Sequence, residues 1–250
     1  MIERSDDNEV AIVRLDHGPV SAMDAELCEA VAAQFRALGT DPAGAVVLTG
    51  TGRAFSAGAD LRRLVAEGEP YIRRFVPALD AMFRAVFELG KPVVAAVNGH
   101  AIAGGCVLAA CADVTLAAEG RGRLGVPELL VGVPFPRVAM EVVRFAVGDV
   151  VASRLMLGAQ TYPVAEAVAL GLVDEVVAPD ALLAEAVVRA RAMATSVPPD
   201  TFAFTKQQLR RDTGERMDRY ADEHERTVEL WNRHVADGWM AAYLESATAK

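Results

Sequence analysis

Short apolar runs alternate with longer amphipathic stretches along the first half of the chain. Four of these runs have the length of buried strands, at residues 9–15, 44–49, 92–97 and 113–118. Apolar side chains at helical spacing predict helices between them, over residues 23–38 and 70–89. Because strands alternate with helices, we expect crossover connections and a largely parallel sheet in an α/β fold.

The second half of the chain has a mostly helical pattern. From about residue 134 onward we expect helices, one short strand at residues 174–178, and strongly charged helix from Pro199 to the end. This change in composition divides the chain. We predict a core over residues 1–198 and a C-terminal helical region over residues 199–250.

The C-terminal region carries a stripe of aromatic residues. Trp231, Trp239 and Tyr243 fall at positions i, i+8 and i+12, which is one face of a single helix. A fully solvated helix has no need of such a stripe. We therefore expect it to pack on another element, and its own domain is the simplest partner.

Length and composition fit one sizeable hydrophobic core, since 52% of the 250 residues are hydrophobic. The net charge of -9 argues against nucleic acid as a partner and gives no attraction to anionic membranes. The spacing of Cys28, Cys106 and Cys111 matches no metal site or disulfide framework. Residues 1–9 are acidic and polar, unlike a signal or transit segment, and no apolar run is long enough to span a membrane, so we expect a cytoplasmic protein.

The most informative segment is the small-residue stretch at residues 50–61, Gly-Thr-Gly-Arg-Ala-Phe-Ser-Ala-Gly-Ala-Asp-Leu. It follows a strand and precedes a helix start, so its backbone N–H groups lack helical partners. Residues 98–107, Asn-Gly-His-Ala-Ile-Ala-Gly-Gly-Cys-Val, repeat the arrangement. Small side chains let a substrate approach the backbone. We expect the Ala57 and Gly104 N–H groups to form one oxyanion hole; the alternative is that both turns only allow tight packing.

A third feature is Glu128, whose neighbours within residues 126–131 are all apolar. A glutamate in a loop is most often solvated. Here the apolar surroundings disfavour the charged carboxylate and raise its pKa toward that of a working base. Asp60, by contrast, is expected to cap the helix that follows it. The G-x-G-x-x-G match at residues 120–125 has no helix after it, so we do not predict dinucleotide binding.

Together these segments resemble the enoyl-CoA hydratase/isomerase (crotonase) family. The family motif of an aromatic followed by small–Ala–Gly–x–Asp is matched by residues 55–60, and its Asn-Gly and Gly-Gly-Cys pieces by residues 98–99 and 104–106. Its catalytic glutamate lies where this chain has Glu128, and the similarity continues through residues 165–177. The resemblance covers nearly the whole chain. It implies a crotonase-type ββα spiral core and a C-terminal helical trimerisation region.

One position departs from the hydratase pattern. Family members that hydrate a double bond carry a second glutamate directly after Gly-Gly-Cys, where this chain has Val107. Moving a double bond needs only one base, and the single-glutamate pattern is similar to that of the Δ3,Δ2-enoyl-CoA isomerases. Residues 18–23, Gly-Pro-Val-Ser-Ala-Met, also resemble an N-terminal segment of those isomerases, whereas Pro127 is more like the hydratases.

The resemblance implies a Δ3,Δ2-enoyl-CoA isomerase that acts on acyl-CoA thioesters in fatty acid metabolism, with no metal or redox cofactor, as a homotrimer or a dimer of trimers. The implied catalytic groups are Glu128, Ala57 and Gly104. The implied substrate-binding residues are Ala22, Ser56, Ala57, Gly58, Ala59, Asp60, Leu61, Gly104 and Val107. Two alternatives stay open: a 2-enoyl-CoA hydratase with another acid, and a catalytically silent acyl-CoA-binding protein.

Overall fold

The computed structural model describes residues 1–248 and is built around a six-stranded sheet in the order β1-β2-β3-β5-β7-β10. Its strands are β1 (Ile2–Asp7), β2 (Val10–Leu15), β3 (Ala45–Gly50), β5 (Val93–Val97), β7 (Val114–Ala118) and β10 (Glu175–Val177). All neighbours pair in parallel except β1, which forms an antiparallel edge with β2. The predicted parallel sheet is confirmed. The edge strand β1 was not predicted, because its polar residues are exposed and leave no hydrophobic pattern.

A second sheet of four short strands has the order β4-β6-β8-β9. Its strands are β4 (Ala54–Ser56), β6 (His100–Ile102), β8 (Arg123–Gly125) and β9 (Thr161–Pro163). Three times along the chain, a strand of the large sheet is followed by a strand of the small sheet and then by a helix. This repeat is the ββα spiral that the family resemblance implied. Three-residue strands are too short to show a period in the sequence.

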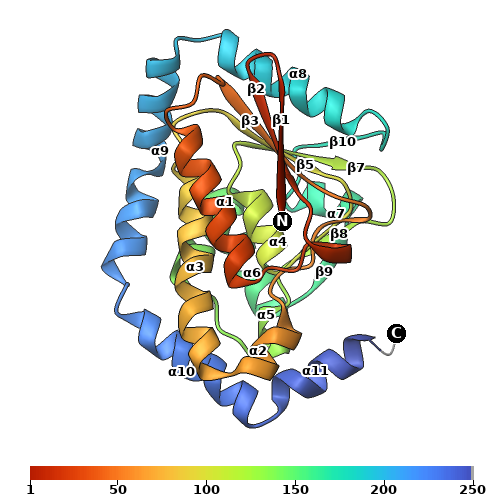
Figure 1. The fold of residues 1–250 in the computed structure, drawn as a ribbon, viewed down its shortest axis with the longest axis vertical. Helices are drawn as coiled ribbons and strands as arrows, with labels where there is room; N and C mark the ends of the chain where they lie inside the picture. Colours follow the sequence, from red (N-terminus) through yellow and green to blue (C-terminus); the bar gives the residue numbers. More distant parts are fainter. Residues whose placement is uncertain (249–250) are drawn as a thin grey trace.

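Alternate residues of the large sheet enter two separate cores. Val46 and Leu48 of β3 face the larger core, together with α1 (Ala25–Leu38) and α3 (Glu69–Phe87). Ala45 and Val47 face the smaller core, which α8 (Leu182–Thr195) covers. Figure 1 shows α1 and α3 side by side on one face of the sheet and α8 across its upper end. Burial on both faces explains why these strands are continuous apolar runs.

Short helices follow the strands of the small sheet: α2 (Leu61–Glu67), α4 (Gly104–Ala110), α5 (Glu128–Val131) and α7 (Val164–Ala169). The longer helix α6 (Arg137–Gly158) follows α5, and a 3-10 turn, η1 (Gly18–Val20), precedes α1. Both glycine-rich segments thus end at a helix start, at α2 and at α4. Within residues 1–248, no helix is long and apolar enough to cross a membrane.

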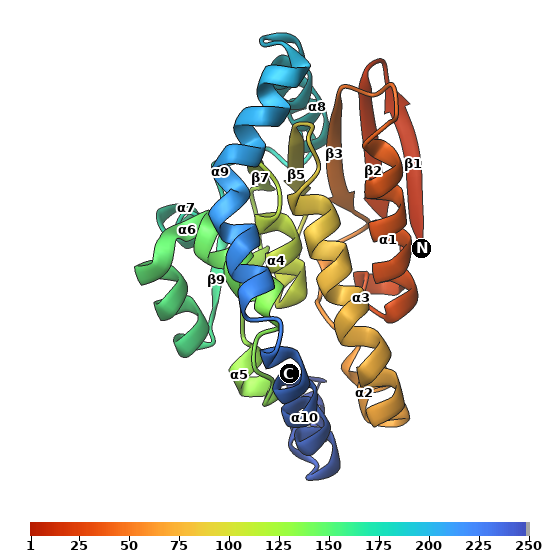
Figure 2. The same ribbon diagram turned by 90° about the vertical axis from the view of Figure 1, so that its left-hand side faces the viewer.

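Three helices form the C-terminal region: α9 (Pro199–Arg219), α10 (Glu223–Ala236) and α11 (Trp239–Thr248). Figure 2 shows α9 descending along the core and α10 at the end of the molecule opposite α8. The prediction that a single helix carries the aromatic stripe is wrong. Gly238, at φ +81°, separates α10 from α11, and the Trp231 and Trp239 indoles donate to carbonyls of their own chain. The last two residues of the predicted region lie outside the described part, and its role in a trimer stays a prediction.

A buried ion cluster attaches α9 to the large sheet. Lys206 and Arg210 of α9 lie 2.6 and 2.8 Å from the two carboxylate oxygens of Asp113, just before β7. Asp113 also accepts the Val93 N–H of β5 at 2.8 Å. Burial lowers the pKa of Lys206 to about 8, against the opposing effect of Asp113. This one carboxylate therefore joins two strands to the C-terminal region.

We predict that Asp113→Ala strongly destabilises the protein, because it leaves two buried cations without a counter-charge. Breaking a buried ion pair from one side costs about 3–5 kcal/mol. Urea unfolding measures the loss. Asp218→Ala is the matched control, since the Asp218 side chain is 71% exposed in its pair with Arg84 and such pairs contribute about 0–1 kcal/mol. Equal losses in the two variants would show that the cluster does not anchor α9.

Candidate active site

The two glycine-rich segments meet at the wall of a cavity of about 100 Å3. The cavity lies between α3, the starts of α4 and α5, and the C-terminal helices. Among the residues predicted to bind substrate, those that line it are Ala57, Ala59, Leu61, Gly104 and Val107. Glu128 lines it from α5. The fold thus brings together groups from segments far apart in the sequence.

Backbone contact between the two segments requires glycine. A Cβ atom on Gly58, which has φ +80°, would lie 2.7 Å from the Ile102 carbonyl oxygen and 3.2 Å from the Gly104 nitrogen. A Cβ atom on Gly105 would lie 2.3 Å from the Ser56 carbonyl oxygen. The contacts with the Ile102 and Ser56 carbonyl oxygens are shorter than a Cβ atom tolerates, so the glycines do allow tight packing. That packing is also what brings the backbone N–H groups of both segments to one wall.

The hydrogen bonds of the first segment revise the expected oxyanion donor. The Ala57 N–H donates to the Val20 carbonyl at 3.0 Å, so it is already engaged. Gly58 and Asp60 pair with Met23, through Met23 N–H to Gly58 O at 2.7 Å and Asp60 N–H to Met23 O at 2.8 Å. Because successive N–H groups of an extended segment point to opposite sides, the Ala59 N–H points away from Met23.

The Ala59 and Gly104 amides, by contrast, are unengaged. Within residues 1–248, neither N–H donates to a hydrogen bond, and both residues line the cavity. We expected Ala57 and Gly104 as the pair of donors. The structure corrects this expectation, because Ala59 takes the place of Ala57. Which amide in a run of small residues pairs with η1 depends on tertiary contacts that the motif does not encode.

A strained residue precedes the second amide. Ala103 has φ +52° and ψ -125°, a backbone conformation that residues other than glycine rarely adopt. Its N–H donates to the Gly125 carbonyl at 2.8 Å, and its own carbonyl accepts from the Cys106 and Val107 N–H groups at 2.9 and 3.1 Å. These bonds fix the turn from both sides. As the first residue of α4, Gly104 has an N–H without an intrahelical acceptor.

Glu128 is a buried carboxyl with an unsatisfied oxygen. It is the first residue of α5 and is only 8% exposed. Its Oε2 has no hydrogen-bond partner within the described residues. Burial raises the pKa of Glu128 to about 8, with the hydrogen bond from its own backbone N–H acting in the opposite direction. A carboxyl in this state can accept a proton and return it near neutral pH.

Val107 and Tyr243 complete the chemical character of the cavity. Val107 is fully buried, one helical turn after Gly104. Tyr243 of α11 also lines the cavity; burial, and then the charge of Glu128, raise its pKa. Among the lining residues in the described part of the chain, Glu128 is the only carboxylate. Within residues 1–248, no group of three or more His, Cys, Asp or Glu side chains is arranged to hold a metal ion.

Four residues predicted to bind substrate lie outside the cavity lining in the described structure: Ala22, Ser56, Gly58 and Asp60. Ser56 donates through Oγ to the Ser21 carbonyl at 2.7 Å, which holds the first segment against the chain before α1. Asp60 caps α2 by accepting the Arg63 N–H at 3.1 Å, as predicted. Trp231 and Tyr243 were not predicted as site residues. Their spacing was visible, but it indicated packing alone.

Comparison with known proteins defines the class of this chain. The family model of the enoyl-CoA hydratases/isomerases matches residues 5–249. The chain therefore belongs to this family and has the crotonase fold. A putative enoyl-CoA hydratase of Thermus thermophilus is 40% identical over 168 residues, which span 66% of this chain and 65% of that protein.

Solved structures extend the comparison. A Mycobacterium tuberculosis protein, named a probable enoyl-CoA hydratase, has a TM-score of 0.82 at 27% identity and covers 92% of this chain and 96% of its own. Another structure of it, named an enoyl-CoA isomerase, has a TM-score of 0.77 at 26% identity over 96% and 97% of the two chains. The human mitochondrial Δ3-Δ2-enoyl-CoA isomerase shares the fold, with a TM-score of 0.88 at 22% identity over 99% and 96%. The names of these proteins do not distinguish the two reactions.

The raised pKa of Glu128 predicts a pH-dependent stability difference. A glutamate has a pKa of about 4.5 when unfolded, against about 8 here, so the unfolded chain ionises first and stability falls as pH rises between these values. Glu128→Gln removes this effect. We expect its melting temperature to exceed that of the wild type at pH 9, with a much smaller difference at pH 5. Glu166→Gln, at an exposed position of α7, is the control and should show neither change.

Proposed function

We propose that this protein is a Δ3,Δ2-enoyl-CoA isomerase. The observation that carries the proposal is that Glu128 is the single carboxylate lining the cavity within residues 1–248. Val107 stands where a hydratase of this family has its second glutamate. Shifting a double bond needs one group that removes a proton and returns it elsewhere on the same face of the substrate. Adding water needs a further group that orients and deprotonates the water.

The proposed reaction begins with the thioester carbonyl oxygen at the Ala59 and Gly104 N–H groups. Glu128 removes a proton from C2 of a 3-enoyl-CoA, and negative charge moves onto that oxygen as a dienolate forms. The two amides stabilise the charge; removal of one such donor costs about 2.7–4 kcal/mol in other enzymes. Glu128, now protonated, delivers its proton to C4, and the product is the 2-enoyl-CoA.

The surroundings of Glu128 suit this two-way transfer. A base that must also act as the acid of the next step works best when its pKa lies near the working pH. Burial raises the pKa of Glu128 to about 8. The carboxyl therefore holds the proton long enough to return it, and the apolar walls keep water from taking it. The thioester supplies the acidity of the C2 proton, so the proposal needs no resident cofactor.

Hydration of a 2-enoyl-CoA is the second candidate, because curated relatives are named hydratases and Pro127 precedes Glu128. Among the residues that the structure describes, Tyr243 is the other titratable group that lines the cavity. Its pKa is raised, so it stays a neutral hydroxyl that can orient a water but deprotonates it poorly. A silent acyl-CoA-binding protein would use the same amides without proton transfer.

Turnover of 3-hexenoyl-CoA and of 2-hexenoyl-CoA, with hexanoyl-CoA binding in parallel, separates these candidates. We expect isomerisation in the wild type, with kcat/KM rising tenfold per pH unit up to about pH 8 as Glu128 ionises. Glu128→Gln should lose about 10²–10⁴-fold in kcat and still bind hexanoyl-CoA. Isomerisation that survives in this variant would exclude Glu128 as the base. Binding without turnover in the wild type would favour the silent protein.

Val107→Glu tests the reason for weak hydration. A valine side chain can neither donate nor accept a hydrogen bond, so it cannot position a water at C3. We expect the wild type to hydrate 2-hexenoyl-CoA slowly and Val107→Glu to raise that rate at least about tenfold, at a stability cost of about 1–3 kcal/mol for the buried polar group. Val107→Gln is the matched control, since it can hold a water without deprotonating it. Fast hydration by the wild type would make the hydratase the better assignment.

A further inference from the structure

A second and larger cavity lies directly behind the active-site cavity. Its volume is about 630 Å3, and it is bounded by α1, α3, the start of α6 and the α9–α10 connection. Three elements contribute neighbouring residues to the two cavities. On α3, Leu79 lines the active-site cavity and Asp80 lines the second one. On α10, Trp231 lines the active-site cavity, and Thr227, one turn earlier, lines the second one. Pro136 lines both. The partition is therefore about one side chain thick.

Trp231 is the largest side chain of this partition, and it is held in place from two sides. Its Nε1 donates to the Pro134 carbonyl at 3.0 Å, and its ring lies 6.0 Å from that of Phe75 on α3, at 44°. Only 3% of the residue is exposed. The indole thus fills the gap between α3 and the loop before α6. A residue with two such contacts cannot swing aside without breaking its hydrogen bond to Pro134.

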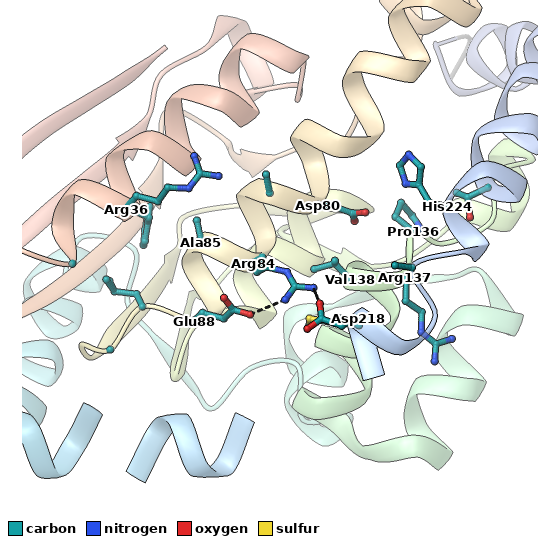
Figure 3. A pocket seen from close by; sticks show the side chains of 18 residues that line it. Arg36, Asp80, Arg84, Ala85, Glu88, Pro136, Arg137, Val138, Asp218 and His224 are labelled. Atoms are coloured by element: carbon teal, nitrogen blue, oxygen red, sulfur yellow. Dashed lines mark hydrogen bonds and ion pairs between the residues drawn. The ribbon is translucent and has the colours of Figure 1, made fainter. Parts of the chain in front are cut away.

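The two cavities differ in chemical character. The active-site cavity is apolar apart from Glu128, Tyr243 and the backbone amides, whereas the second cavity is lined by several charged residues. Figure 3 shows the Asp80 carboxylate extending from α3 toward His224 and Pro136, and Arg84 between its partners Glu88 and Asp218. Asp80 Oδ1 is buried without a hydrogen-bond partner in the described part of the chain. The partition therefore separates an apolar chamber from one that is partly lined by charged side chains.

We propose that Trp231 determines acyl-chain length, by ending the acyl cavity so that the enzyme takes short chains of about four to six carbons. The inference rests on the proposed function, since it requires that the cavity hold an acyl-CoA. A cavity of about 150 Å3 is large enough for benzene, so about 100 Å3 accommodates only a few carbons. Each further methylene would have to displace Trp231 or enter the polar chamber.

The wild-type chain-length series is the first test. We expect the affinity for saturated acyl-CoAs, measured by calorimetry, to rise about fourfold per methylene while the cavity fills, from butanoyl- to hexanoyl-CoA. The affinity should then fall at least about tenfold by decanoyl-CoA. The turnover of 3-decenoyl-CoA should fall in parallel, relative to that of 3-hexenoyl-CoA. If decanoyl- and hexanoyl-CoA bind equally well and both 3-enoyl-CoAs turn over, the inference is wrong and the proposed function stands. If no acyl-CoA binds at any length, the proposed function itself fails.

The second test removes the partition. We expect Trp231→Ala to join the two cavities and the ratio of 3-decenoyl-CoA to 3-hexenoyl-CoA turnover to rise at least about tenfold, with Trp231→Phe in between. Trp239→Ala is the matched control: this residue is in the same region, is 56% exposed and bonds the Leu130 carbonyl, and the ratio should not change. Trp231→Leu replaces the alanine variant if the latter does not fold. An unchanged ratio in a folded Trp231 variant would show that another residue limits the chain.

Discussion

The close approach of two backbone turns is the constraint on which the site depends. Gly58 lies against the Ile102 carbonyl and Ala103 with no room for a side chain, and Gly105 lies against the Ser56 carbonyl in the same way. This contact places the small sheet beside the helix starts of α2 and α4. It also directs the Ala59 and Gly104 N–H groups to one wall. Without it, each segment would be an ordinary strand-to-helix connection.

The burial of Glu128 is a second consequence of the spiral. Each ββα unit leaves its helix start at the same end of the sheets, so α5 places its first residue beside the amides of the two earlier units. The apolar residues around that point remove water from the carboxyl and raise its pKa. One arrangement of the backbone therefore positions both the two amides and the carboxyl. In the proposed isomerase these are the oxyanion donors and the base, and the valine on α4 leaves the base without a second carboxylate.

The C-terminal helices complete this site rather than standing apart from it. Trp231 and Tyr243 line the cavity, although they lie more than a hundred residues after Glu128. The ion cluster of Asp113, Lys206 and Arg210 holds α9 against the large sheet, and α9 in turn sets where α10 begins. The C-terminal region, which we predicted to form the trimer, therefore also contributes side chains to the cavity of its own chain.

The sequence by itself determined the parallel strands, the two helix starts after small residues, the capping role of Asp60 and the apolar setting of Glu128. Each of these follows from local periodicity or from the chemistry of neighbouring residues. The tertiary structure alone decided that Ala59 rather than Ala57 has the unengaged N–H, because the partner of Ala57 is Val20 in a distant turn. It also decided that the helix carrying the aromatic stripe breaks at Gly238, and that Trp231 lines the cavity. Such features depend on which surfaces meet in space, and a pattern along one chain does not contain that information.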